Sequence, residues 1–447
     1  MPPSRLLKRL IRDSHSRELI RGSSLAMAFR LGGALMNYLL NFAIARLFGA
    51  SVVGAFAIAT TVVLVLGMLS RLGLDRAIVR FIAAGFARGN PDIAARQFWI
   101  GFWVIILLGS LFAAATFVMA DLIAASVFGK PHLAMALRWV APAVAGASLA
   151  LYTAESLRGL KRIGEFAFLR YVLVPTLSVP LLFVFVQWIE PSLVPMASFL
   201  FATAITALTG LLLIARQLPT AAPLAKAGMV SMVAIALPML LSNSMGMIIS
   251  WTDILMLGRF VTEEQVGIYS ITFKLAFVTA IVLNAVNSIS TPKFAEMYAQ
   301  GHLAELGSIM RQTTRLLFLT AVPVLLVLII LGESLLGLFG VEFKAGYSAL
   351  VILIVGQFIS TISGPVGNLL QMTGNERVFL KIVAAAATAN VVLNLVLIPS
   401  YGIVGAAIAS AITLSANNVA CVIVIRRKFG FLSVYVPSSV FDKPRVQ

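Results

Sequence analysis

The sequence predicts an all-α polytopic membrane protein with about twelve transmembrane helices, arranged in two six-helix lobes around a central cavity. Three observations predict this fold class: the composition, the length of the apolar stretches and an internal repeat. Hydrophobic residues make up 60% of the 447 residues, charged residues only 11%, and the mean hydropathy is +0.99. Because soluble domains contain about 25% charged residues, we expect most of the chain to lie in lipid.

The apolar stretches have the length that a bilayer requires. A hydrocarbon core roughly 30 Å thick needs about 20 apolar residues per helix. The stretches are continuous and rich in Leu and Ala, without the alternation of membrane strands, which favours helices. The expected helices run over residues 23–48, 51–73, 98–120, 133–157, 166–188, 194–216, 231–258, 265–290, 314–332, 347–372, 378–398 and 402–425.

A repeated motif indicates that the two halves of the chain are related. At an offset of 213 residues the motif Arg46, Gly54, Phe56, Ile58 recurs as Arg259, Gly267, Tyr269, Ile271. Each copy lies where one apolar stretch ends and the next begins. Six helices per half is an even number, so both halves enter the membrane in the same orientation, and we expect an axis along the membrane normal to relate them.

The expected domain boundaries follow from these halves. Residues 1–22 form a basic N-terminal segment, 23–217 the first lobe and 230–428 the second lobe. The segment 218–229, which contains two prolines, is the expected cytoplasmic linker. Residues 429–447 form a tail.

The basic residues orient the chain, because they gather in every second loop. Beyond the N-terminal segment they are Arg76, Arg80, Arg88, Arg96, Arg158, Lys161, Arg162, Arg216, Lys226, Lys293, Arg311, Arg315, Arg377, Lys381, Arg426, Arg427 and Lys428. By the positive-inside rule both termini are cytoplasmic. The net charge of +17 is then explained by topology and by contact with anionic membrane lipids, and no nucleic acid partner is expected.

Several classes of site are not expected. Cys421 is the only cysteine, and the histidines His15, His132 and His302 are scattered, so neither a metal site nor a cofactor site is predicted. The N-terminus lacks the apolar core of a removable signal peptide. The expected outer loops are too short for a catalytic domain, which argues against an enzyme.

Polar residues inside the apolar stretches are the candidate functional residues, since polar groups are costly in lipid. Arg30, Asn37 and Asn41 are spaced by seven and four residues, which puts them within roughly 40° of one another on the first helix. In the corresponding seventh helix, Asn243 and Asp253 share one face.

Arg30 and Lys274 point to an anionic ligand. Neither lies at a helix end, and an unpaired cation in hydrocarbon costs several kcal/mol. A cavity with fixed cations binds phosphate or pyrophosphate, Arg through a bidentate fork and Lys as a point charge. For Asp253 two interpretations stay open, an ion pair with Lys274 or a place along the pathway.

The sequence also resembles a known family. The motifs are Ala45–Ala50 (ARLFGA), Gly54, Leu72–Leu74, Arg80–Phe81, Thr252–Gly258 (TDILMLG), Val266–Tyr269 (VGIY) and Leu393–Ala409 (LNLVLIPSYGIVGAAIA). With these motifs the chain resembles the oligosaccharide (polysaccharide repeat-unit) flippases of the multidrug/oligosaccharidyl-lipid/polysaccharide exporter superfamily. The related lipid II flippases have two further helices, which this length does not supply.

The resemblance implies a function and a location. A flippase of this family moves a polyprenyl-pyrophosphate-linked oligosaccharide from the cytoplasmic to the periplasmic leaflet by alternating access, for surface polysaccharide, exopolysaccharide or O-antigen synthesis. It implies a multi-pass protein of the bacterial inner membrane, with polysaccharide polymerase and export machinery as further partners. The cationic cavity of such families fits Arg30 and Lys274 by position and charge.

Alternatives from other classes remain. A multidrug and toxin exporter of the same superfamily, coupled to protons or sodium, binds organic cations through intramembrane acids, and here Glu155 and Asp253 are the acids available. A membrane enzyme using the same lipid-linked sugars needs a large periplasmic loop, and nothing favours a non-transporting scaffold. The residues do not decide which coupling ion, proton or sodium, drives transport.

Overall fold

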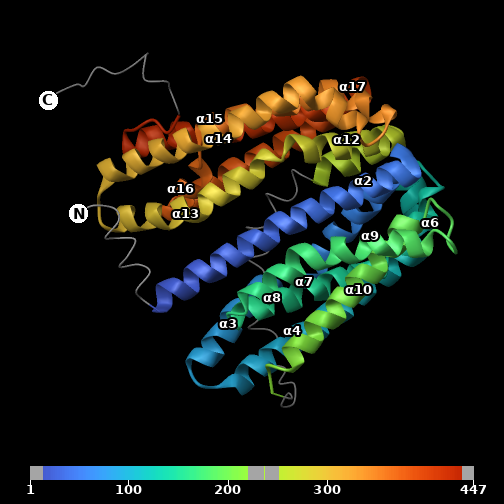
Figure 1. Cartoon of the computed structure of the whole chain (residues 1–447), viewed down its shortest axis with the longest axis horizontal. Helices are drawn as coiled ribbons and strands as arrows, with labels where there is room; N and C mark the ends of the chain where they lie inside the picture. Colours follow the sequence, from blue (N-terminus) through green and yellow to red (C-terminus); the bar gives the residue numbers. More distant parts are fainter. Residues whose placement is uncertain (1–13, 220–235, 237–250, 435–447) are drawn as a thin grey trace. The chain divides into compact units, whose positions relative to one another are not determined.

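The computed structural model describes residues 14–219, 236 and 251–434 of the chain. It divides into two compact units, Met1–Ser244 and Met245–Gln447, which are described separately. In Figure 1, the blue to green helices belong to unit 1 and the yellow to red helices belong to unit 2. The expected linker 218–229 lies mostly outside the described residues, so the domain boundaries stay a prediction.

Unit 1 is a helical bundle around the long helix α2. Its elements are α2 (Ser14–Arg71), α3 (Leu74–Ala87), α4 (Pro91–Val118), α5 (Ala120–Leu122), η1 (Ile123–Val127), α6 (Leu133–Val140), α7 (Ala143–Gly159), α8 (Ile163–Ala167), η2 (Phe168–Leu173), α9 (Val174–Phe185) and α10 (Val194–Ala215). Helix α2 packs against α7, α8, η2 and α9, and α7 also packs against α3, α4 and α10.

Glycine separates the first two spans. At Gly49, φ is 81° and ψ is 176°, a conformation that only glycine adopts readily. The chain bends there, so the expected stretches 23–48 and 51–73 lie on the two arms of α2. The start of α4 is marked by Asn90, whose side chain accepts a hydrogen bond from the amide of Ile93 at 3.3 Å, with Pro91 at the first helical position.

Unit 2 begins for the described residues with a helix over 251–260. It continues with α12 (Glu263–Ala276), α13 (Thr279–Ala299), α14 (Leu303–Gly337), η3 (Val341–Gly346), α15 (Tyr347–Ser363), α16 (Val366–Met372) and α17 (Glu376–Phe429). Helix α15 packs against α12, α14 and α17, and α16 packs against α13 and α17.

A second glycine bend divides α17. Gly402 has φ 55° and ψ −131°, so the separately expected stretches 378–398 and 402–425 form the two arms of this helix. A Cβ on Gly405 would lie 2.3 Å from the carbonyl oxygen of Leu397. The two arms therefore meet backbone to backbone, and glycine is required at this contact.

The spans confirm the fold class. Eight described helices are long and apolar enough to cross a membrane, or nine if α12 and α13, bent by 41°, form one span. Since α2 and α17 each contain two expected stretches, every expected stretch falls on described helices except 231–258, most of which lies outside the described residues. The protein is an all-α polytopic membrane protein with about twelve transmembrane helices.

Candidate functional site

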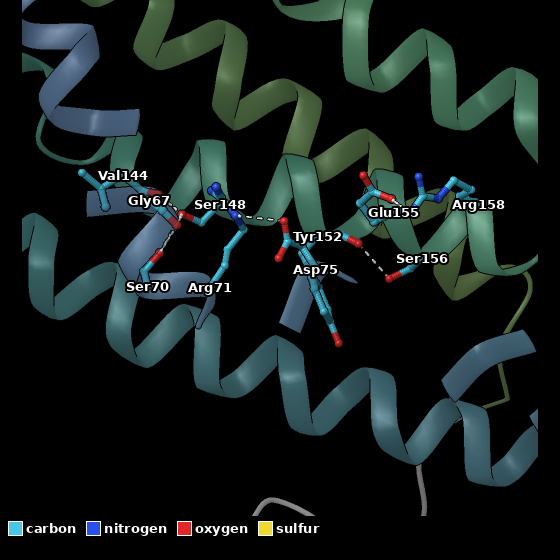
Figure 2. Close-up of polar contacts among 10 residues, drawn as sticks. All are labelled: Gly67, Ser70, Arg71, Asp75, Val144, Ser148, Tyr152, Glu155, Ser156 and Arg158. Atoms are coloured by element: carbon cyan, nitrogen blue, oxygen red, sulfur yellow. Dashed lines mark hydrogen bonds and ion pairs between the residues drawn. The ribbon is translucent and has the colours of Figure 1, made fainter. Parts of the chain in front are cut away.

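Buried charges gather in unit 1 where α2 ends beside α7. Arg71 is 7% exposed and Glu155 is 2% exposed. Arg71 Nε lies 3.6 Å from Asp75 Oδ2, and Arg158 Nη2 lies 2.8 Å from Glu155 Oε2; Figure 2 shows both pairs. Buried charges are tolerated when they are paired, so each acid here has an arginine three or four residues away in the sequence.

A break in the helical path places the Arg71–Asp75 pair. Leu72 has φ 48° and Gly73 has φ 80°, so two successive residues are left-handed between α2 and α3. Such a conformation is uncommon for a residue other than glycine. Charged groups beside an interrupted helix inside a bundle are typical of ligand sites in transporters.

Small residues bring α2 and α7 together at the same level (Figure 2). Ser70 Oγ and Ser148 Oγ are hydrogen-bonded at 2.8 Å. A Cβ on Gly67 would lie 3.1 Å from Ser148 Oγ and 3.2 Å from Arg71 Nη1. The helices therefore approach closely, and the Arg71 guanidinium is enclosed between them.

Two further arginines contact one tyrosine on η2. The guanidinium carbon of Arg30, on α2, lies 5.7 Å from the centre of the Tyr171 ring, and that of Arg170 lies 5.9 Å from it. Both distances are within the range of a cation–π interaction. Arg30 forms no ion pair with an acid in the part of the chain that the structure describes.

The contact between α2 and η2 depends on a glycine one turn beyond Arg30. A Cβ on Gly33 would lie 2.3 Å from the carbonyl oxygen of Tyr171 and 2.6 Å from its carbonyl carbon. Segment η2 is a π-helical turn, and such turns are frequent at functional sites because they shift the direction of the side chains. Gly33 and η2 together set the position of Tyr171 relative to Arg30.

We call these charged residues the arginine cluster: Arg30, Arg71, Arg76, Arg158 and Arg170, with Asp75 and Glu155. Arg170 and Arg76 are close enough for their charges to influence both Arg71 and Glu155, and Arg170 and Arg30 both lie against the Tyr171 ring. The cluster contains five cations and two acids, which leaves a surplus of three positive charges. This arrangement suits an anion with several charged oxygens, such as a phosphate or pyrophosphate.

In unit 2, Asp253 lies in a hydrogen-bonded cluster of its own. It is fully buried and accepts hydrogen bonds from Tyr269 Oη at 2.6 Å, from Asn394 Nδ2 at 2.7 Å and from Ser410 Oγ. Asn394 also donates to Asn390 Oδ1 at 3.1 Å. These bonds join the helix 251–260, α12 and both arms of α17. Among the described residues, Asp253 is thus bonded to Tyr269, Asn394 and Ser410 and not to Lys274.

The other predicted residues are distributed as follows. Asn41 is buried and donates to the backbone oxygen of Asn37 at 2.6 Å and to its Oδ1 at 3.1 Å, while Asn37 itself is exposed. Lys274 is half-buried on α12. Asn243 lies outside the described residues. None of these contacts tests a role in binding, so the predicted set of site residues stays a prediction.

Sequence reasoning missed most of the arginine cluster. The sequence identifies Arg76 only as a topological signal, does not single out Arg71 or Asp75, and suggests Arg170 only as an ion-pair partner of Glu155. The structure pairs Glu155 with Arg158 instead. One signal was available: Arg170 and Tyr171 are adjacent inside an apolar stretch, where a charged residue is costly.

The fold and the arginine cluster define a class: a polytopic helical membrane protein with charged groups enclosed in the bundle, as in transporters. The model of the family described as "Polysaccharide biosynthesis protein" matches residues 19–298, and the MatE model matches residues 235–396. The chain therefore belongs to the polysaccharide biosynthesis family, a polysaccharide flippase family of the multidrug/oligosaccharidyl-lipid/polysaccharide (MOP) exporter superfamily. This confirms the resemblance found in the sequence.

Curated relatives come from Haloferax volcanii. The chain is 26% identical over 175 residues to the probable low-salt glycan biosynthesis flippase Agl15 and 25% identical over 185 residues to the probable flippase AglR. These matches cover 39% and 41% of this chain, and 37% and 39% of the relatives. The chain thus spans less than two fifths of the length of the relatives that it matches.

Solved structures share the fold. An inward-facing MATE-family multidrug resistance transporter matches with a TM-score of 0.72 at 14% identity, over 88% of this chain and 98% of that chain. The lipid II flippase MurJ in an inward closed conformation matches with a TM-score of 0.70 at 14% identity, over 91% and 87%. At this identity the likeness concerns the fold alone.

Proposed function

We propose that this protein is a flippase that moves a polyprenyl-pyrophosphate-linked oligosaccharide repeat unit across the bacterial inner membrane, for surface polysaccharide, exopolysaccharide or O-antigen synthesis. The observation that supports this most directly is the placement of Arg30 and Arg170 against Tyr171 within a cluster that has three surplus positive charges. A pyrophosphate linked to a lipid is an anion that such a cluster binds in a bundle.

The direction of transport follows from the predicted topology. With both termini cytoplasmic, the cluster lies toward the cytoplasmic ends of its helices, because Arg71 ends α2 and Arg158 is one residue from the end of α7. The pyrophosphate enters from the cytoplasmic leaflet, binds the arginine cluster and leaves toward the periplasm when access alternates. Polymerase and export machinery are the proposed consumers of the product.

The remaining predicted residues take secondary roles in this proposal. Lys274 is proposed as a further cation for the substrate, and Asn37, Asn41 and Asn243 as amide groups for its sugar hydroxyls. Arginine holds a phosphate with two parallel hydrogen bonds, whereas lysine acts as a point charge. We therefore expect Arg30 to contribute more to binding of the pyrophosphate than Lys274 does.

Mass spectrometry of the lipid fraction from cells lacking the gene tests the proposal. We expect a complete polyprenyl-pyrophosphate-linked repeat unit to accumulate and surface polysaccharide to fall, with both restored by the wild-type gene. The absence of any such lipid, in cells that express the pathway, would contradict the flippase.

A second candidate is a cation-coupled multidrug exporter of the same superfamily. The observation that favours it is the fully buried Asp253, because an intramembrane acid is the group that binds a cation. Its carboxylate is however engaged by Tyr269, Asn394 and Ser410. Efflux of an organic cation that depends on Asp253, with no accumulated lipid-linked glycan, would support this candidate instead.

The close approach of Gly33 to the Tyr171 backbone gives a first prediction. In Gly33→Ala the new Cβ collides with the Tyr171 backbone, so α2 and η2 must separate and Arg30 loses its place on the ring. We expect transport to fall at least about fivefold, since a misplacement of 1 Å costs up to about a hundredfold in rate at a binding site. The measurement is surface polysaccharide per amount of protein in the membrane.

Gly32→Ala is the matched control. A Cβ on Gly32 meets nothing within 4 Å, and alanine favours a helix by about 1 kcal/mol over glycine. We expect wild-type transport from this variant. Equal transport from the variants at positions 32 and 33 would show that the α2–η2 contact does not matter for function.

A further inference from the structure

Glu155 has an unusual position within the arginine cluster. Its carboxylate is 2% exposed and pairs with Arg158 at 2.8 Å (Figure 2). The charges of Arg170 and Arg76 act on it as well, and its own charge acts on Arg71. One buried anion therefore contacts Arg158 directly and lies within the electrostatic influence of three further cations that the proposed function assigns to the pyrophosphate.

The other acid of the cluster, Asp75, has a different partner. Asp75 lies 3.6 Å from Arg71, four residues away across the helix break. Arg158 is also held from a second side, since its guanidinium carbon lies 5.3 Å from the centre of the Phe166 ring. Of the arginines around Glu155, Arg170 is the one that also contacts Tyr171 and through it approaches Arg30. Arg170 thus lies against Tyr171 at the proposed pyrophosphate site, and its charge also influences Glu155.

We propose that Glu155 is an internal counter-anion that sets the affinity of the site for its anionic substrate and allows release. In the empty site its carboxylate neutralises part of the arginine charge. A bound pyrophosphate competes with Glu155 for Arg170 and Arg76, and Glu155 regains these interactions when the pyrophosphate leaves.

The physical reason is that transport requires binding that is strong enough for entry and weak enough for exit. Without Glu155, the cluster would keep five cations against Asp75 alone and would hold a pyrophosphate more tightly, in a bundle where electrostatic interactions are strong. An internal carboxylate lowers this affinity and lowers the cost of the empty state, in which unpaired arginines would otherwise be buried. This inference rests on the proposed function, since it assumes that the pyrophosphate binds at the cluster.

The test compares Glu155→Gln with the wild-type protein, using the full chain in lipid nanodiscs and undecaprenyl pyrophosphate as the probe. Glutamine keeps the size of the side chain and removes its charge. We expect the dissociation constant to fall about tenfold, and in a transport assay both kcat and KM to fall, because release becomes slow. An unchanged or weaker affinity in Glu155→Gln overturns the inference.

Glu165→Gln is the matched control. Glu165 lies on α8 in the same unit and pairs with Arg162, so the variant removes the same charge outside the cluster. We expect its affinity and transport to equal those of the wild type. An equal gain in affinity in both variants would show that the effect is general electrostatics, which also overturns the inference.

A second variant provides the test if the first one misfolds. If Glu155→Gln does not insert, Glu155→Asp keeps the charge but draws the carboxylate back by about one methylene, and we expect about twofold to threefold tighter binding. No tightening in Glu155→Asp then overturns the inference.

If the wild type does not bind the probe and Arg30→Ala makes no difference, the proposed function fails and the inference with it. If Arg30→Ala weakens binding while Glu155→Gln changes nothing, only the inference fails.

Discussion

Replacing Arg30 by alanine should nearly abolish transport while the protein stays inserted in the membrane. A hydrogen-bonded contact to a charged group contributes about 1.5–3 kcal/mol, which corresponds to a loss of affinity of about 10-fold to 150-fold. The substitution also removes the cation that faces Tyr171 at 5.7 Å. The measurement is surface polysaccharide in a strain that lacks the chromosomal gene, at equal membrane abundance of the variant.

Arg46→Ala is the control for this variant. Arg46 is also on α2, and its guanidinium also lies over a ring, 5.9 Å from the centre of Phe42, but it is not part of the arginine cluster. We expect its transport to stay near that of the wild type. Arg30→Lys should be intermediate, because lysine keeps the charge and loses the planar fork. Wild-type flux from Arg30→Ala would disprove the cationic site.

The second large effect is expected for stability, at Asp253. In Asp253→Ala, the hydroxyls of Tyr269 and Ser410 and the amide of Asn394 lose their shared acceptor inside the protein. A buried donor left without a partner costs about 1–3 kcal/mol, and buried networks are lost together. We expect a loss of about 3 kcal/mol or more, seen as a fall of about 5 °C or more in the apparent Tm of the purified protein.

Two variants calibrate that result. Asp253→Asn keeps one carbonyl oxygen as an acceptor, so we expect a smaller fall in Tm. Asp92→Ala removes an exposed acid from the first turn of α4, where charges contribute only about 0.3–1 kcal/mol. A Tm for Asp253→Ala that matches Asp92→Ala would mean that the hydrogen-bonded cluster does not stabilise unit 2.

The fold was predictable because lipid imposes one requirement on every part of the chain. Each span must satisfy its own backbone, so a stretch of about 20 apolar residues becomes a helix wherever it occurs. The break between the spans of α17 was also predictable, since Pro399 and Gly402 are local signals. The end of α2 near residue 73 was also expected, whereas the left-handed Leu72 was not, because a leucine with positive φ depends on the packing around it and not on its own preference.

The candidate site was predictable only in part. The sequence identifies Arg30 as a cation within an apolar helix, and its charge and depth already indicate an anionic ligand. Its neighbours Tyr171 and Arg170 are about 140 residues away along the chain, and no periodicity connects them with α2. Asp253 was likewise recognised as a buried acid, while its partners Asn394 and Ser410 come from the two arms of α17.

The sequence by itself determined the medium and the helical class. It also predicts the relation between the two halves and an anionic ligand. These properties follow from composition and from the local spacing of apolar and charged residues. Only the tertiary structure decided which arginines share a neighbourhood, that Glu155 lies among them, and that Asp253 is held by hydroxyl and amide donors. The physical reason is that helical periodicity fixes which side chains share a face of one helix, whereas contacts between helices depend on close approaches, such as the one at Gly33, that only the packed bundle defines.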